Sequence, residues 1–319
     1  MNAYSNLLIV RTPFQAWICL KLVDQCRLDS YDLMYITHDD SEEDRRYFER
    51  LSARASNFDY IYVKPVCFDV FTHIKLRLRV KRWFNRRSYK GIYVGSIDAL
   101  VINSLICKFS GAKVYTFDDG LANLVKDGSY HVDIGGRRLS MYRWMLGASP
   151  VSSIKERIVQ HYSIYKGFCN IVDSSKVTYL NGWSKVEGLG SLAASDMDVK
   201  RYFIGAPFDE VMSIDEIKRM IELIRNVKID GYVMHPREKV ALSIGADVVE
   251  KKGRIAEEFI IEDSKGFSFE LYGHLSSVMI NLQDFAERRI VFLPREKFIG
   301  AIGVLAKEAG CEVVVLNEG

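Results

Sequence analysis

The chain has 319 residues, of which 48% are hydrophobic and 27% charged, a composition typical of globular proteins that excludes extensive disorder. Its formal net charge of +3 is too small to favour nucleic acid as the main partner. The longest apolar runs fall far short of the roughly 20 residues of a membrane-spanning helix, and the N-terminus has no export signal. We therefore expect a cytoplasmic protein.

Apolar, β-rich runs alternate with longer helical patterns in the first half of the chain. We predict strand and helix pairs at 7–11 and 14–25, 31–37 and 42–51, 60–63 and 70–84, and 92–94 and 99–109, then a strand at 113–117. Continuous apolar strands that alternate with helices indicate a parallel sheet covered on both faces. Residues 1–185 are therefore predicted to form a Rossmann-like N-terminal domain.

A second series of strands and helices follows a polar stretch at 182–198, within which we assign 186–198 as a linker. The predicted strands are 201–204, 231–234, 267–272, 290–293 and 312–316, and the predicted helices are 214–225, 254–261, 274–286 and 298–309. Residues 199–319 thus form a second Rossmann-like domain. Two such domains facing a central cleft form the α/β architecture called GT-B in glycosyltransferases, with ligands at the carboxyl ends of the strands.

Two adjacent carboxylates follow the last strand of the first half. Asp118 and Asp119 precede Gly120 at the edge where an open α/β sheet holds its chemistry, but Asp and Gly are also ordinary turn residues. Segment 116–120 also resembles the opening motif of metal-dependent polysaccharide deacetylases. Those enzymes need two further histidines one helical turn apart, and the six histidines of this chain include no such pair.

His235 and Arg237 come directly after predicted strand 231–234, separated by Pro236, which restricts the backbone. An arginine guanidinium can donate two charge-assisted hydrogen bonds to a phosphate, and histidine can donate a hydrogen bond or a proton. A surface histidine beside a loop proline is the alternative interpretation. Further along, the hydroxyls of segment 272–277 could bind an anion at a helix start or simply cap that helix.

Asp196 and Asp198 resemble the Asp-x-Asp metal site of another glycosyltransferase architecture. They lie in the predicted linker rather than after a strand, so we interpret them as part of a solvated loop. The 6 cysteines are scattered singly, without the close pairs of a zinc or redox site. We therefore expect no metal site.

Residues 75–90, KLRLRVKRWFNRRSYK, carry eight basic side chains and no acid. Lys75, Arg79, Arg82 and Arg86 have the spacing of one helix face. Between Lys75 and Lys90 the chain could therefore rest on anionic headgroups at the cytoplasmic face of the inner membrane. A merely solvated helix face is the alternative.

Seven segments, in this order, resemble the bacterial sialyltransferases of glycosyltransferase family 52, the group that contains the lipooligosaccharide sialyltransferases. They are Thr12-Pro13-Phe14-Gln15, 116–120 with Asn123-Leu124, 162–167, 177–180, Gly205-Ala206-Pro207, His235-Pro236-Arg237, and 269–272 with Ser276. One such segment would be weak, but seven in register over most of the chain are hard to obtain by chance.

The resemblance implies a GT-B fold, inversion at the anomeric carbon, and CMP-sialic acid as the donor. The acceptor would be a terminal galactose or similar sugar of a bacterial surface glycan or glycolipid, such as lipooligosaccharide or capsule. The resemblance also favours a homodimer. Because sialic acid is linked through a single phosphate, the transfer should require neither a metal nor another cofactor.

The same resemblance suggests residue roles. His235 would be the general acid at the CMP phosphate, and Asp209 is our candidate for the base, although the family has its acid directly after the proline where this chain has Phe208. Asp118 and Asp119 are reserve candidates. The implied donor-binding residues are Arg237, Gly205, Pro207, Tyr272, Ser276 and Ser277, and the implied acceptor-binding residues are Thr12 and Gln15.

Two alternatives remain at this point. A glycosyltransferase of the same family could use another nucleotide sugar, because a fold does not fix the donor. A non-catalytic glycan-binding or assembly protein is the second alternative, against which the intact set Asp118, Asp119, Asp209 and His235 argues.

Overall fold

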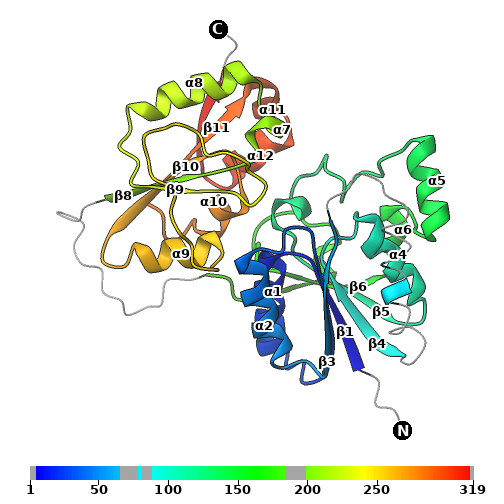
Figure 1. The fold of residues 1–319 in the computed structure, drawn as a ribbon. Helices are drawn as coiled ribbons and strands as arrows, with labels where there is room; N and C mark the ends of the chain where they lie inside the picture. The colour runs from blue at the N-terminus through cyan, green and yellow to red at the C-terminus, as the bar shows by residue number, and fades with distance from the viewer. Residues whose placement is uncertain (1–4, 65–75, 77, 81–87, 184–198, 317–319) are drawn as a thin grey trace. The chain divides into compact units, whose positions relative to one another are not determined.

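The computed structural model of the chain describes residues 5–64, 76, 78–80, 88–183 and 199–316. It divides into two compact units, Met1–Asn181 and Gly182–Gly319, each built on its own sheet (Figure 1). The predicted linker 186–198, with Asp196 and Asp198, lies outside the described residues, as does most of the basic stretch 75–90 and of the predicted helix 70–84. The predicted domain boundaries therefore stay predictions.

The first unit contains a seven-stranded sheet whose paired strands are all parallel. Its strands lie in the order β3-β2-β1-β4-β5-β6-β7, so the direction of winding reverses between β1 and β4. In open α/β sheets, ligands bind beside the carboxyl ends of the strands at such a switch point. The strands are β1 (Ser5–Val10), β2 (Tyr31–Thr37), β3 (Asn57–Tyr62), β4 (Tyr89–Val94), β5 (Lys113–Phe117), β6 (Ile158–Ser163) and β7 (Val177–Tyr179).

Two helices of this unit, α1 and α2, begin at capping residues that fix their first turns. The hydroxyl of Thr12 accepts the amide N–H of Gln15 before α1, which starts at a proline. Ser41 and Asp44 form a reciprocal capping box at the start of α2. The elements are α1 (Pro13–Gln25), α2 (Glu42–Ser52), α4 (Leu100–Lys108), the 3-10 turn η1 (Gly120–Asn123), α5 (Arg137–Leu146) and α6 (Val151–Arg157).

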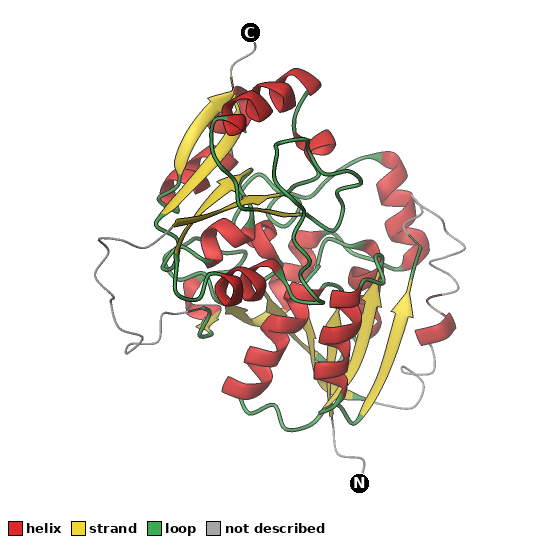
Figure 2. Cartoon of the chain, turned by 60° about the vertical axis from the view of Figure 1, so that its left-hand side comes forward, coloured by secondary structure: helices red, strands yellow, loops and turns green. Residues whose placement is uncertain are grey.

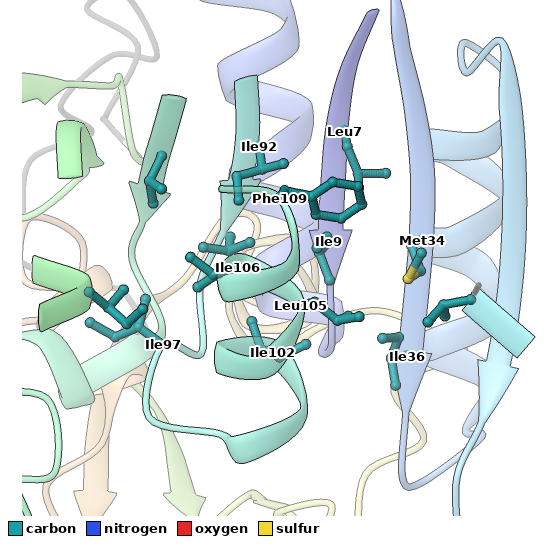
Figure 3. Packing of buried hydrophobic residues seen from close by; sticks show 14 of the residues in the cluster. Leu7, Ile9, Met34, Ile36, Ile92, Ile97, Ile102, Leu105, Ile106 and Phe109 are labelled. Carbon is teal, nitrogen blue, oxygen red and sulfur yellow. The ribbon is translucent and has the colours of Figure 1, made fainter. Parts of the chain in front are cut away.

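Both faces of the first sheet are buried, as the continuous apolar strands predicted. Leu7 and Ile9 of β1 belong to the same buried apolar cluster as Leu105 of α4 (Figure 3). Successive strand residues point to opposite faces, and the alternate residues Leu8 and Val10 are buried as well. The arrangement of strands flanked by helices recurs in the second unit (Figure 2).

The second unit has a five-stranded parallel sheet in the order β12-β11-β10-β8-β9, with its switch point between β8 and β10. All five predicted strands are present: β8 (Val199–Ile204), β9 (Gly231–Val233), β10 (Ser268–Gly273), β11 (Arg288–Pro294) and β12 (Glu312–Leu316). The helices are α7 (Phe208–Val211), α8 (Ile214–Arg225), α9 (Ala256–Asp263), α10 (Ser277–Asn281), α11 (Arg295–Ile299) and α12 (Ala301–Glu308).

Two predicted helices of this unit are wrong in extent. Predicted helix 274–286 contains only the short α10, and predicted helix 298–309 is broken at Gly300, whose extended backbone separates α11 from α12. Within the described part of the chain, none of the helices is long and apolar enough to cross a membrane.

Candidate active site

The backbones of β8 and β10 approach closely at the switch point of the second sheet. Ile204 pairs with Gly273, and a Cβ atom on Gly273 would lie 2.4 Å from the carbonyl oxygen of Ile204. Gly273 also has a φ of +151°, which disfavours any other residue. A Cβ on Gly205 would lie 2.9 Å from the backbone N of His235 and would collide with the carboxylate of Glu238. Glycine at 205 therefore lets the loop after β9 lie against the end of β8.

His235 lies half-buried in that loop, with one ring nitrogen already committed. Its Nδ1 accepts the backbone N–H of Arg237 at 3.1 Å, so the proton of the neutral ring is on Nε2. Burial, followed by the positive charges of Arg237 and Lys251, lowers the pKa of His235 to about 4. The ring is thus neutral at pH 7, and its Nε2–H is the group that a ligand can meet.

Glu238 anchors the loop that carries His235. Its Oε1 accepts the hydroxyl of Tyr232 and its Oε2 accepts the backbone N–H of His235 at 3.2 Å. Burial is the main cause that raises the pKa of Glu238, and the nearby charge of Asp209 raises it further. The hydrogen bonds from Tyr232 and His235 act in the opposite direction but do not cancel the rise. Glu238 was not among the predicted site residues, although a carboxylate three residues after His235 is a sequence signal for such a loop anchor.

Asp209 and Glu210 lie exposed in the single turn α7, which begins after Pro207. Glu210 accepts a hydrogen bond from Arg237 at 2.8 Å, in an ion pair that is more than half exposed on both sides. Arg237 therefore holds a carboxylate at the place where a donor phosphate was predicted. Because exposed ion pairs contribute little stability, a phosphate could replace Glu210 at small cost.

Two buried polar atoms follow β10 without a hydrogen-bond partner among the described residues. His274 donates from Nδ1 to the carbonyl oxygen of Leu275 at 3.1 Å, which leaves its buried Nε2 as an unpaired acceptor. The hydroxyl oxygen of Ser276 is likewise buried and unpaired. Unpaired buried polar atoms are costly, so both are candidates to meet a ligand. His274 was missed by sequence analysis, although it stands within the segment 272–277.

The other two predicted donor-binding side chains on this segment differ in what they can offer. The hydroxyl of Tyr272 donates to Glu270 at 2.7 Å, so this group is already used within the sheet. Ser277 begins α10 and is partly exposed. The structure thus brings Gly205, His235 and Arg237 together, and it places Ser276 at the end of the neighbouring strand β10.

A second polar network occupies the switch point of the first sheet, between β1 and β4. Gln15 is fully buried, with its Oε1 accepting the N–H of Arg11 at 2.9 Å and its Nε2 donating to Ser96 at 2.7 Å. Ser96 donates to Oδ2 of Asp119 at 2.8 Å, and the hydroxyl of Tyr130 donates to the same oxygen at 2.6 Å. Burial raises the pKa of Tyr130 well above its usual value, so Tyr130 remains a donor.

This network leaves one carboxylate oxygen of Asp119 unused. Its Oδ1 accepts no hydrogen bond from the described residues, and the side chain is partly exposed. Thr12 and Gln15, by contrast, are engaged in capping α1 and in holding Ser96. Their predicted role in binding the acceptor stays a prediction, and the geometry favours a role in positioning Asp119. Ser96 and Tyr130 were not singled out from the sequence.

Asp118 is enclosed by the chain. Its side chain is fully buried, Oδ1 accepts from His161 at 3.1 Å, and Oδ2 accepts the N–H of Ile164 at 2.7 Å. These bonds join the end of β5 to β6 and the segment after it, so the geometry favours a structural role over that of a base. The described residues contain no group of three or more His, Cys, Asp or Glu side chains placed to hold a metal ion.

Replacing Asp118 should therefore affect stability. We expect Asp118→Ala to lower the free energy of unfolding by about 2–5 kcal/mol, because it leaves the buried donor of His161 and the partly buried amide of Ile164 unpaired and opens a small cavity. Urea denaturation of the variant measures the loss. The exposed Asp127 provides the control, since Asp127→Ala should change stability by no more than about 0.5 kcal/mol. A stable Asp118→Ala protein would contradict the structural role.

Three bacterial proteins are similar to this chain over most of its length. An N-acetyllactosaminide alpha-2,3-sialyltransferase of Neisseria meningitidis serogroup A is 23% identical over 98% of this chain and 86% of its own length. A CMP-N-acetylneuraminate:beta-galactoside alpha-2,3-sialyltransferase of Pasteurella multocida is 26% identical over 88% of this chain and 87% of its own. An N-acetyllactosaminide alpha-2,3-sialyltransferase of Haemophilus influenzae is 24% identical over 72% and 73%, respectively.

Solved structures identify the fold. The alpha/beta-galactoside alpha-2,3-sialyltransferase of Photobacterium phosphoreum matches with a TM-score of 0.61 and 12% identity over 99% of both chains. The glycosyltransferase SnogD of Streptomyces nogalater matches with a TM-score of 0.54 and 11% identity over 98% of this chain and 88% of SnogD. These neighbours are GT-B glycosyltransferases, which confirms the predicted fold class. The sequence profile of Glycosyltransferase family 52 matches residues 33–296, and the chain therefore belongs to this family.

Proposed function

We propose that this enzyme transfers sialic acid from CMP-sialic acid to a terminal galactose-type sugar of a bacterial surface glycan, with inversion at the anomeric carbon. The observation that carries the proposal is the position of His235, a neutral imidazole beside Arg237 in the loop that packs against the end of β8. The activity named for the Pasteurella relative supports the same donor and a galactoside acceptor, and those named for the Neisseria and Haemophilus relatives support sialyl transfer to N-acetyllactosaminide.

The chemistry of sialyl transfer suits these side chains. Cleavage of the bond to the sugar passes through an oxocarbenium-like state while the phosphate of CMP departs. Because the ring is neutral and its Nδ1 accepts the amide of Arg237, the Nε2–H of His235 would donate a hydrogen bond to that phosphate and stabilise its developing charge. This role replaces the proton transfer that the family resemblance implies. Arg237 would exchange Glu210 for the phosphate, while Asp209 removes the proton of the acceptor hydroxyl. A general base contributes about 10² to 10⁴ in rate, and one hydrogen-bond donor aimed at a developing charge contributes about 10² to 10³.

The direct test is incubation with CMP-sialic acid and a panel of galactose-terminated acceptors, with the products read by mass spectrometry and their anomeric configuration by NMR. We expect one sialylated product of inverted configuration. Melting-temperature shifts with CMP, UDP and GDP identify the nucleotide, because a ligand of the folded state raises its melting temperature. Stabilisation by UDP or GDP alone would assign another donor, and binding of an acceptor without transfer from any donor would indicate a non-catalytic protein.

Transfer should persist in excess EDTA. A metal commonly neutralises a diphosphate leaving group, whereas the donor proposed here leaves with a single phosphate that the charge of Arg237 and the Nε2–H of His235 can stabilise. Initial rates with and without EDTA, after prior dialysis against the chelator, provide the measurement. Complete loss of transfer that added Mg²⁺ or Mn²⁺ restores would contradict metal independence and revive a metal-dependent reaction.

The remaining expectations on partners and location belong to the proposal. They are a homodimer, no nucleic-acid partner, and a cytoplasmic location with peripheral membrane contact through residues 75–90, most of which lie outside the described part of the chain. Sedimentation velocity of the purified protein tests the dimer.

A further inference from the structure

Helix α5 lies at an edge of the first unit (Figure 1). The helix and the loop before it expose a group of large apolar side chains. The exposed fractions are 81% for Trp144, 52% for Met141 and 56% for Ile134. Together with Arg137 and Arg138, these residues are here named the α5 surface. An exposed apolar patch rimmed by polar residues commonly marks an interaction site.

The α5 surface is held in place by contacts of the chain itself. Leu146 is buried at the end of the helix, which terminates at Gly147 in the left-handed conformation with a φ of +63°. Arg143 donates from its guanidinium to the carbonyl oxygen of Ile134 at 3.2 Å and so joins the helix to the preceding loop. Trp144 is therefore presented outward on an ordered helix rather than on a loose end.

All charged side chains of helix α5 are positive. Arg137, Met141 and Trp144 follow one another at helical spacings of four and three residues, so an arginine lies at one end of the apolar row. Helix α5 contains three arginines and no acid, and no ion pair of the described residues involves Arg137 or Arg138. The neighbouring acid, Asp133, accepts the backbone N–H of Val151 at 2.7 Å.

We propose that the α5 surface docks onto an anionic phospholipid bilayer, with Trp144, Met141 and Ile134 at the boundary between headgroups and acyl chains and the arginines on lipid phosphates. Tryptophan is favoured at this boundary, and basic side chains add attraction to anionic lipid. A two-fold contact of this surface with itself would supply no acidic partner for its arginines, because α5 contains no acid. The proposal is independent of the transfer reaction and concerns a segment other than residues 75–90.

Vesicle flotation tests the proposal on the full chain. We expect the protein to float with vesicles of equimolar phosphatidylglycerol and phosphatidylcholine, and much less with phosphatidylcholine alone or at high salt, which screens the attraction. Trp144→Ser and Arg137→Glu/Arg138→Glu should each weaken vesicle binding at least about tenfold. The matched controls Val240→Ser and Arg225→Glu/Lys228→Glu alter exposed residues of the second unit and should bind like the unmodified protein.

The outcomes separate the possible occupants of the surface. Transfer to a soluble acceptor and the melting temperature should be unchanged in Trp144→Ser, because the Trp144 side chain is exposed and contributes little to the core. Equal flotation of the variants and the unmodified protein, or no flotation of either, would overturn the proposal. So would a lipid-free dimer that Trp144→Ser converts to a monomer, because that result would assign the α5 surface to a second copy of the chain.

Discussion

We expect His235→Ala to lower the turnover number for sialyl transfer by at least about a hundredfold, the usual cost of removing a hydrogen-bond donor from a developing negative charge. The variant loses the Nε2–H that would meet the departing phosphate, whereas Arg237 remains to bind the nucleotide. The Michaelis constant for CMP-sialic acid should therefore change much less than the turnover number. Steady-state kinetics with saturating acceptor separates the two quantities.

The pH dependence of stability supplies a second, independent readout for the same variant. The pKa of His235 is lowered from its ordinary value of 6.5 to about 4 by burial and by two neighbouring cations. The unfolded chain therefore binds this proton more readily between pH 6.5 and 4, so the folded protein loses stability as the pH falls through that window. His235→Ala should lose less stability there. Normal turnover of His235→Ala would show that His235 takes no part in the reaction.

Asp209→Ala should lower turnover by a similar factor, at least about a hundredfold, if its carboxylate removes the proton of the acceptor hydroxyl. The competing carboxylates of this region are both engaged: Glu238 accepts from Tyr232 and His235, and Glu210 pairs with Arg237. Asp209 is exposed at the start of α7. Initial rates at saturating concentrations of both substrates provide the measurement.

Glu210→Gln is the matched control for this variant, because it changes the adjacent carboxylate of the same turn. It should keep most of the turnover, since an exposed ion pair contributes little. Normal turnover of Asp209→Ala would move the base to the first unit. Asp119 would then be the stronger candidate, because it has an oxygen free of described partners whereas Asp118 is fully enclosed.

The strands were predictable because a parallel sheet buried on both faces leaves a continuous apolar run, and the five strands of the second unit follow that pattern. The shorter elements of the second unit were not predictable in this way. The single turn α7 arises where Pro207 fixes the backbone after β8, and Gly300 divides one apolar helical pattern into α11 and α12. The elements α5, α6, β6 and β7 were not predicted, because the segment after Asp119 mixes short helices and strands without a sustained period.

For the candidate site, the sequence predicts that certain residues follow strand ends, but it does not predict their contacts. The sequence places His235 and Arg237 after a strand, but it contains no information on which ring nitrogen meets the amide N–H of Arg237 or on the pairing of Arg237 with Glu210. Asp118 and Asp119 are adjacent in sequence, yet the alternation of the backbone directs one inward to His161 and the other to Ser96. Such differences depend on contacts between residues far apart in the chain.

The hydrogen bond between Gln15 and Ser96 connects residues 81 positions apart, across the junction of β1 and β4. Contacts of this kind form only after a long loop has closed, which makes them late events in folding. The carboxylate of Asp119 is thus oriented only once the central strands have paired. During refolding, we expect Tyr130, which is buried in the same network, to become buried when the sheet is completed rather than with the earlier appearance of helices.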